Sequence, residues 1–352
     1  MPYCRKCGTQ LDPESKFCYN CGTPVTPTAT APVYVRQPAI RKSSSVAAII
    51  LISILVFALV AAIVVFLPMH QVSFTQSNEA SAANVNTLNL IVNADVANVN
   101  IMFKNLSGNQ RATVNVTATG RRGMSSSEKP VSLAFEEKTI AQTLRYTVGI
   151  NRTDKWNLFN NVQVTCEVYI DPSINLDLIV QTGTGGVSFN TSSALTIENL
   201  FLATTTGSVD ATLAEKTIIA GPVELLTTTG SAQLHWNNTS ASGNIPVNIK
   251  ATTGSVTATI SQNKQLSGNV TVDAETTTGG VVLALDIGSV GARIEASTGF
   301  LGGTSVDQTG FSSDAAPLQS GNYPAQSNFD IALRATTGGI QIEANYEPGI
   351  SN

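Results

Sequence analysis

The sequence predicts a mostly β protein whose long second part is a β-solenoid, preceded by a small cysteine-rich domain and one apolar helix. Three features of the 352-residue chain carry this prediction: two Cys-x-x-Cys pairs, an uninterrupted apolar run, and a recurring Thr-Gly motif. The predicted segments are a metal-binding domain (1–25), a Pro/Thr/Ser-rich linker (26–45), a membrane-spanning helix (46–67), a β-rich first part of the ectodomain (72–180) and a repeat solenoid (181–347).

Four of the five cysteines form two pairs, Cys4 with Cys7 and Cys18 with Cys21, each followed by a glycine. Two residues between the cysteines let a tight turn point both thiolates at one ion, and the glycine permits the positive φ of that turn. Two such pairs complete a tetrahedral shell, for which Zn²⁺ is the expected metal. The alternatives are a rubredoxin-like iron site and a pair of disulfides, which a reducing compartment disfavours.

With thiolates in all four positions the ion keeps no site for water, so the zinc is predicted to be structural. A segment this short could not otherwise bury a sufficient core. The stretch YCRKCGTQLDPESKFCYNCGTPV (3–25) resembles the zinc-ribbon modules at the amino termini of many prokaryotic membrane proteins. That resemblance implies a structural ribbon that can dock a cytoplasmic protein. Its cations are offset by carboxylates, so no nucleic-acid partner is expected.

Residues 26–45 contain three prolines among Thr, Ala and Ser and are predicted to form an extended tether. The run from Val46 to Leu67 has no charge and one polar residue, Ser53. As a helix it would measure about 33 Å, enough for a hydrocarbon core of about 30 Å. We therefore predict one transmembrane helix that acts as an uncleaved signal anchor. A cleaved signal peptide is the alternative, although its apolar stretch would be shorter and nearer the amino terminus.

The cations around this run predict its orientation. Arg36, Arg41 and Lys42 precede the run, and no basic residue follows it until Lys104. Because basic flanks stay on the cytoplasmic side, the amino terminus is predicted to be cytoplasmic and the carboxyl-terminal domain extracytoplasmic. The expected location is thus the cell membrane, with a single pass and contact with lipid through one helix.

Residues 68–352 carry fourteen Lys/Arg and twenty-two Asp/Glu, which excludes electrostatic attraction to nucleic acid or anionic lipid. The predicted exterior is neutral and rich in Thr, Ser and Asn. Seven Asn-x-Ser/Thr sequons follow the apolar run and permit glycosylation. They begin at Asn105, Asn115, Asn151, Asn190, Asn237, Asn238 and Asn269.

Aligning the bends that contain a glycine preceded by threonine gives seven copies of one repeat, with spacings of 22, 23, 24, 25, 20 and 39 residues between their glycines. A period in the low twenties without a helical pattern is typical of a β-solenoid, right- or left-handed, with coils of about 20–25 residues. The glycines are Gly185, Gly207, Gly230, Gly254, Gly279, Gly299 and Gly338.

Apolar residues keep a period of two around each of these glycines, at seven and five residues before it and at two and usually four residues after it. This phase predicts two short strands with one inward face, joined by a Thr-Gly bend, and a continuous aliphatic column. The inward positions two residues after each glycine are Val187, Val209, Ala232, Val256, Val281, Leu301 and Ile340.

Four residues before the glycine, charged side chains are expected on successive coils as a solvated face. They are Lys250, Glu275, Glu295 and Arg334. The copy at Gly299 is degenerate after its glycine, and residues 302–328 read as an insertion, either a loop over the last coils or a contact surface.

Residues 72–180 also show alternating apolar patterns but lack the Thr-Gly bend, so they are predicted to form the irregular, capping start of the same β body. Cys166 alternates in phase with Val164 and Val168 and is expected to be buried. An intermolecular disulfide is the alternative for this cysteine.

From CEVYIDPSINLDLIVQTGTGGVSF to NYPAQSNFDIALRATTGGIQIEA, the chain resembles the putative adhesin family of bacterial and archaeal β-solenoid domains over roughly residues 85–345. The resemblance implies surface attachment and supplies no catalytic residues. The copy at Gly299 departs from the family's regular pattern.

His70 and His235 are the only histidines, which gives no support to a Ser-His-Asp or Cys-His arrangement, so no enzyme is expected. The predicted function is that of a membrane-anchored, adhesin-like structural protein of the cell surface. Its expected partners are envelope polysaccharide or another surface protein. The alternative is a transmembrane sensor or scaffold that reports through the cysteine domain to a cytoplasmic protein.

Overall fold

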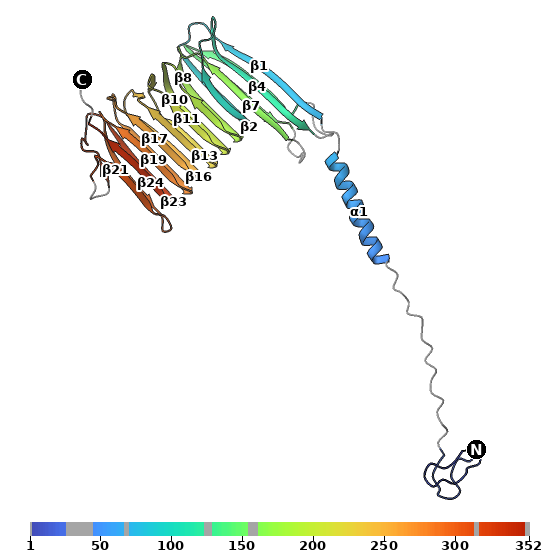
Figure 1. Ribbon diagram of the computed structural model, residues 1–352. Helices are drawn as coiled ribbons and strands as arrows, with labels where there is room; N and C mark the ends of the chain where they lie inside the picture. The colour runs from blue at the N-terminus through green and yellow to red at the C-terminus, as the bar shows by residue number, and fades with distance from the viewer. Residues whose placement is uncertain are drawn as a thin grey trace. The chain divides into compact units, whose positions relative to one another are not determined.

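The computed structural model describes residues 2–25, 45–66, 70–122, 129–153, 161–312 and 317–348. The chain divides into two compact units, Met1–Phe66 and Leu67–Asn352. The first contains the four clustered cysteines and helix α1 (Ser45–Phe66), and the second, the β unit, contains strands β1 to β24 (Figure 1). The predicted linker lies outside the described residues, apart from Ser45.

Helix α1 covers the predicted apolar run except Leu67, which lies outside the described residues. Its described side chains extend from Ala48 to Val60 and are exposed. The hydroxyl of Ser53 donates to the carbonyl of Ile49 at 2.8 Å, so this polar side chain is satisfied within the helix. Over the described residues, no helix combines the length and the apolar character that crossing a membrane needs. The predicted transmembrane helix is therefore not supported by the structure.

The β unit contains two large sheets, which confirms the prediction of a mostly β protein. In spatial order, sheet 1 consists of β1 (His70–Ser81), β4 (Gln110–Arg122), β7 (Asn161–Ile170), β3 (Asn98–Phe103), β9 (Val187–Asn190), β11 (Val209–Leu213), β14 (Ala232–Asn237), β17 (Val256–Gln262), β19 (Val281–Ile287), β24 (Ile340–Tyr346) and β21 (Thr304–Thr309). Sheet 2 consists of β22 (Leu318–Gln319), β20 (Gly291–Thr298), β23 (Asn328–Thr337), β18 (Val270–Thr278), β16 (Ile245–Thr253), β13 (Val223–Thr229), β10 (Leu195–Thr206), β8 (Asn175–Thr184), β2 (Thr87–Val96), β6 (Thr143–Arg152) and β5 (Val131–Ile140). Two short strands are attached to it: β12 (Thr217–Ile219) pairs with β10, and β15 (Ser240–Ala241) pairs with β12.

A strand of sheet 2 that is followed in the chain by a strand of sheet 1 forms a pair that we call a rung. A Thr-Gly motif forms the corner of the rung at Gly185, Gly207, Gly230, Gly254, Gly279 and Gly338. In the middle of the β unit, successive rungs pair in parallel with both neighbours, as β13 does with β10 and β16. The inward side chains of both sheets form one continuous buried cluster. The predicted inward positions are buried in every copy, apart from Leu301 in the copy at Gly299.

The last rung in the sequence is not the last rung in space. Strand β23 pairs with both β18 and β20, and β24 pairs with both β19 and β21. After β19 the chain therefore skips the position next to β18–β19 and forms the outermost rung, β20–β21. It then returns, and β23–β24 occupies the skipped position. The predicted insertion 302–328 contains β21 and β22 and makes this return, which explains the long spacing of 39 residues.

The same interleaving occurs at the other end of the β unit. Rung β2–β3 lies between β6–β7 and β8–β9, although it precedes both in the sequence. Antiparallel strands complete this end: β4 and β1 extend sheet 1, and β5 extends sheet 2. Parts of the predicted irregular start are thus regular rungs, and β1, β4 and β5 are the capping elements.

The motif at Gly299 does not form the corner of its rung. The amide of Ile340 donates to the carbonyl of Gly303 at 2.9 Å, the bond that Val281 makes with Gly339 in the neighbouring rung. Gly302 therefore takes the corner place, three residues later than predicted. As a result Leu301, expected to point inward, is 79% exposed.

The backbones of successive corners stack closely. Gly254 has φ of 139°, and its amide donates to the carbonyl of Thr278 at 2.8 Å. A Cβ built on Gly254 would lie 1.7 Å from the carbonyl oxygen of Gly230 in the preceding rung. Glycine is required here both for its positive φ and for the approach of the neighbouring backbone.

A ladder of buried threonines lies three residues before the corner glycine. Their hydroxyls donate to a corner carbonyl of the adjacent rung, as Thr204 does to Gly185 at 2.8 Å and Thr227 does to Gly207 at 3.0 Å. Thr276 makes the same bond to Gly254 at 2.9 Å. Alanine occupies this place at Ala251. The sequence analysis placed the threonines of the motif at the bend. It did not predict that the threonine three residues before the glycine is buried and hydrogen-bonded.

We expect Thr227→Val to lower the free energy of unfolding by about 1–2 kcal/mol, because a buried carbonyl loses its donor. The reverse change, Ala251→Thr, should raise it by about 1 kcal/mol by supplying the missing donor to Gly230. Chemical denaturation of the two variants and the parent measures both effects. Equal stabilities for all three proteins would contradict a stabilising role for the ladder.

The charged row is confirmed in part. Lys250, Glu275 and Arg334 are directly opposite one another on β16, β18 and β23, and Lys250 Nζ lies 3.1 Å from Glu275 Oε2. Glu295 instead pairs with Ala332, because the outermost rung is shifted. Cys166 is fully buried as predicted, and burial raises the pKa of its thiol to about 12.

Candidate metal centre and surface groove

The cysteine domain is built from two turns of the same geometry, fourteen residues apart in the sequence. In the first, the amide of Gly8 donates to the carbonyl of Cys4 at 2.9 Å, and in the second Gly22 donates to Cys18 at 2.8 Å. Both glycines have positive φ, of 70° and 65°, as the motif predicts. The two turns therefore present their cysteines in equivalent positions.

The structure brings the four predicted ligands together. The sulfur atoms of Cys4, Cys7, Cys18 and Cys21 all lie within 4.8 Å of one another. Two pairs, Cys4 with Cys21 and Cys7 with Cys18, are 3.6 Å apart. Tetrahedral coordination with Zn–S bonds of about 2.3 Å places sulfurs about 3.8 Å apart, so the donor set fits one zinc ion.

Two threonines that the sequence analysis did not single out support the thiolates. The hydroxyl oxygens of Thr9 and Thr23 lie 3.3 Å and 3.1 Å from the sulfurs of Cys7 and Cys21. Hydrogen bonds from the hydroxyl and the backbone of Thr9 lower the pKa of Cys7 to about 6, and those of Thr23 lower the pKa of Cys21. Their equal placement, two residues after each second cysteine, was the signal available in the sequence.

The apolar interior of this domain is small. Leu11 is buried beside Cys4 and Cys18, and Val25 packs against this group. Such a cluster cannot stabilise the fold alone, and thiolates fill every ligand position. The metal centre is therefore a structural zinc site.

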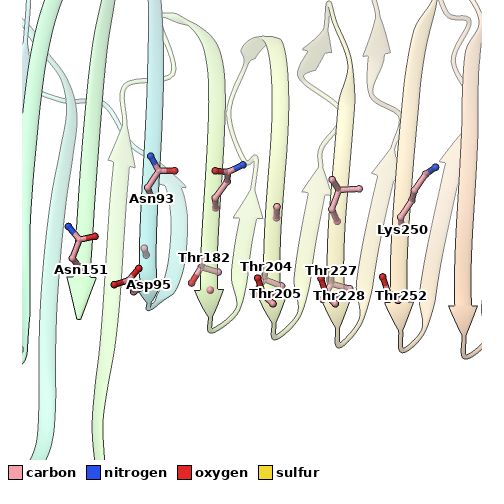
Figure 2. Close-up of a pocket in the computed structure, with 15 residues that line it drawn as sticks. Asn93, Asp95, Asn151, Thr182, Thr204, Thr205, Thr227, Thr228, Lys250 and Thr252 are labelled. Carbon is pink, nitrogen blue, oxygen red and sulfur yellow. The ribbon is translucent and has the colours of Figure 1, made fainter. Parts of the chain in front are cut away.

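A shallow groove of about 770 Å³ lies on the outer face of sheet 2, near the carboxyl ends of its strands (Figure 2). It crosses β6, β2, β8, β10, β13 and β16. Figure 2 shows Asn151, Asn93 and Asp95 at one end and Lys250 at the other, with threonines between them. The groove was not predicted from the sequence.

The strand register aligns the groove into rows. Thr205, Thr228 and Thr252 occupy matching exposed positions on β10, β13 and β16, so hydroxyls recur at the strand spacing of about 4.8 Å. Gln181, Ala203, Leu226 and Lys250 form the next row, directly opposite one another on β8, β10, β13 and β16. The groove thus combines hydroxyls with an apolar floor and a charge at each end.

An apolar row lies beside the groove on the same outer face. Ile91, Ile179 and Phe201 are directly opposite one another on β2, β8 and β10, and each is only partly buried. Outward positions of a solvated sheet are ordinarily polar. The row of Gln181 and Ala203 separates these three side chains from the hydroxyls of Thr205 and Thr228. The same face thus carries an aromatic side chain, two branched side chains and a row of hydroxyls, a surface suited to a ligand with both hydroxyls and flat apolar faces.

Three comparisons with known proteins complete the description. Residues 3–25 match the zinc-ribbon domain family. No curated protein sequence matches the chain. The chain is similar to the crystal structure of a putative cell adhesion protein from Clostridium sporogenes ATCC 15579, with 15% identity and a TM-score of 0.40, over 78% of this chain and 100% of that chain.

Two further crystal structures are similar to the chain. A putative adhesin from Bacteroides fragilis NCTC 9343 has 8% identity and a TM-score of 0.27, over 77% of this chain and 97% of that chain. A putative adhesin from Parabacteroides distasonis ATCC 8503 has 11% identity and a TM-score of 0.30, with the same coverage of 77% and 97%. Likeness at this level assigns no function to the chain.

Proposed function

We propose that this is a single-pass membrane protein of the cell surface whose non-catalytic β-solenoid ectodomain binds an envelope polysaccharide, with a structural zinc ribbon on the cytoplasmic side. The observation that carries the binding proposal is the groove with its neighbouring apolar row. A linear sugar polymer lying across the strands would meet an equivalent position about every 4.8 Å. Its hydroxyls suit Thr205, Thr228 and Thr252, and its ring faces suit Phe201.

The anchoring proposal rests on the sequence from Val46 to Leu67 and on the cations that precede it. It is tested by an Asn263→Cys variant, which places a thiol at an exposed position. A membrane-impermeant maleimide should label this variant in intact cells. The parent protein is the control, since buried Cys166 and the zinc-bound cysteines should not react. Labelling only after lysis, with the protein in the membrane fraction, would contradict the proposed orientation.

We expect the double variant Phe201→Ser, Leu226→Ser to bind isolated envelope polysaccharide at least about tenfold more weakly than the parent, because one apolar side chain is lost from the row beside the groove and one from the groove itself. Both side chains face outward, so the fold should be retained. Val282→Ser is the matched control, since Val282 is a partly exposed apolar residue on the outer face of sheet 1. Cosedimentation with the insoluble polymer measures binding. Equal loss in the control, or no loss in the double variant, would contradict the groove as the site.

The second candidate function is a sensor or scaffold that docks a cytoplasmic protein on the ribbon. The exposed aromatic side chains of Tyr3, Phe17 and Tyr19 favour it, with 62%, 62% and 79% of each residue exposed. They are not part of the ribbon's small core. Deleting residues 2–25 separates the two functions. Polysaccharide binding should survive the deletion if the ectodomain acts alone, whereas a reporter would lose its cytoplasmic output.

A further inference from the structure

The seven Asn-x-Ser/Thr sequons of the chain are not equivalent in the structure. Transfer of a glycan to such a motif requires access to the asparagine and to the hydroxyl two residues later, since the motif is defined by both residues. A glycan is also bulky, so its asparagine must lie at the surface. The burial and the hydrogen bonds of each motif therefore decide which asparagines can carry one.

The motif at Asn190 is accessible at both positions. Asn190 is the last residue of β9 and is exposed, and Ser192 is exposed in the loop that leads to β10. No described residue makes a hydrogen bond with either side chain. Thr191, between them, is buried, and its amide donates to the carbonyl of Thr212 at 3.0 Å. The backbone of this motif is therefore held in place while both of its recognised side chains face solvent.

The motif at Asn105 is accessible in a similar way. Asn105 and Ser107 are exposed in the loop between β3 and β4. The amide of Leu106, between them, donates to Asp171 Oδ2 at 3.1 Å and fixes the loop. The hydroxyl of Ser107 donates to the side chain of Gln110 at 3.2 Å, at the surface. Because a solvent-exposed hydrogen bond contributes little net free energy, this hydroxyl stays available.

The overlapping motifs at Asn237 and Asn238 use their side chains within the fold. Thr239, two residues after Asn237, is fully buried, and its hydroxyl donates to the carbonyl of Leu213 at 2.8 Å. The side-chain oxygen of Asn238 accepts the amide of Asn263 at 2.7 Å. An enzyme would have to break one of these bonds before it could act on either motif. The folded protein therefore withholds both.

The motifs at Asn269 and Asn115 are closed by contacts between strands. The side-chain oxygen of Asn269 accepts the amide of Asn328 at 2.9 Å, which links β18 to β23 where both strands begin. Asn115 is partly buried in the middle of β4, where Ser77 of β1 and Glu167 of β7 are opposite it. Neither asparagine can accept a glycan without separating paired strands.

Asn151 differs from these four because its side chain is exposed, at one end of the groove (Figure 2). The hydroxyl of Thr153, the third residue of its motif, donates to the backbone carbonyl of Lys129 at 2.6 Å. This hydroxyl is thus already engaged by the backbone. A glycan on Asn151 would also cover the groove.

The two accessible asparagines lie on the side of the β unit away from the groove. Strands β3 and β9 pair in parallel with Ile101 opposite Phe189, so Asn105 and Asn190 lie at the carboxyl ends of adjacent strands of sheet 1. Each rung turns from sheet 2 into sheet 1 at its corner, so the carboxyl ends of sheet 1 strands are far from the corners. The groove lies near the corners, at the carboxyl ends of sheet 2 strands. Glycans at these two positions would therefore leave it open.

We propose that Asn105 and Asn190 carry N-linked glycans and that the other five sequons are unmodified. This inference rests on the extracytoplasmic location proposed above. The donor is an oligosaccharide whose anomeric carbon is bonded to a lipid phosphate. The side-chain nitrogen of asparagine attacks this carbon, so a C–N bond forms and the anomeric C–O bond breaks. The phosphate leaves as an anion with the bonding electrons, and the nitrogen gives one proton to a base of the transferring enzyme.

The test is peptide mapping by mass spectrometry of the full-length protein, purified from membranes of the cells that naturally produce it. Peptides containing Asn105 and Asn190 should carry a glycan, and those containing the other five sequons should not. Unmodified Asn190 in protein whose Asn263→Cys thiol is labelled in intact cells would overturn this inference, while the proposed location would stand. A glycan on Asn238 or Asn269 would also overturn it, because glycan addition would then be independent of the fold.

Two neighbouring serines in the loop after β9 supply a matched pair of variants. Ser192→Ala keeps Asn190 but removes the hydroxyl of its motif, so the intact protein should lose the mass of one glycan. Ser193→Ala changes a serine outside the motif and should keep both glycans. A glycan retained at Asn190 in Ser192→Ala, or lost from both variants, would contradict the assignment of this site.

Discussion

Replacing Gly254 by alanine is expected to destabilise the β unit by about 4 kcal/mol or more, which places it among the most damaging single substitutions. The backbone φ of 139° alone costs a side chain about 1–3 kcal/mol. In addition, the new Cβ would lie 1.7 Å from the carbonyl oxygen of Gly230. That oxygen belongs to a backbone held by hydrogen bonds on both sides, so the rungs would have to separate. Chemical denaturation followed by circular dichroism measures the loss.

Gly243→Ala is the matched control for this prediction. Gly243 also has positive φ, of 94°, but a Cβ there meets nothing within 4 Å. Its loss should therefore stay within the conformational cost of about 1–3 kcal/mol. If the two variants lose equal stability, close stacking of the corners is not what makes glycine necessary at Gly254.

The period and phase of the sequence were sufficient to predict the inward residues of the regular rungs. Alternation forces side chains to opposite faces, so Val256 and Val281, placed two residues after their corner glycines, had to be buried together. The same argument correctly predicted that Cys166 is buried. These features depend on local geometry, which the sequence encodes directly.

The sequence pattern does not predict the order of the rungs in space. Strands β18 and β20 have similar alternating inward residues, and nothing in alternation says which of them β23 will contact. In the structure β23 contacts both. The position of β23 depends on its pairing with strands that are distant in the sequence, and a local alternation pattern does not encode such pairing.

The sequence pattern located the irregular copy but not its geometry. The copy at Gly299 keeps the Thr-Gly pair and is degenerate after it, and in the structure the corner is formed by Gly302, so Leu301 points outward. A glycine can occupy either place, and the choice depends on the bond between Gly303 and Ile340 in the neighbouring rung. A motif of two residues cannot specify how far from it along the chain the corner glycine lies.

The two candidate sites differ in the same way. The zinc site is contained in 23 residues, and the cysteine spacing predicts its ligands because they are close in sequence. The groove draws its residues from six strands between Asn93 and Thr252. When each strand is considered alone, its outward side chains are typical of a solvated sheet face. Only the register that places Phe201 beside Ile179 reveals the surface.

Substituting Cys18 by serine is expected to abolish zinc binding and unfold the ribbon. Zinc binding in small domains contributes about 10–16 kcal/mol of apparent free energy at neutral pH, and the buried cluster around Leu11 is too small to replace it. Metal analysis of the purified full-length protein should give one zinc per chain in the parent and none in Cys18→Ser. Residues 2–25 of the variant should become sensitive to protease.

Cys166→Ala is the matched control, because Cys166 is buried in the β unit and is not among the four clustered cysteines. This variant should retain one zinc, whereas Cys18→Ser should retain the unfolding transition of the β unit, since the two units are compact on their own. A zinc ion kept by Cys18→Ser would contradict the four-cysteine site. If removing zinc abolished the unfolding transition of the β unit, the ribbon would be shown to stabilise the β unit as well as itself.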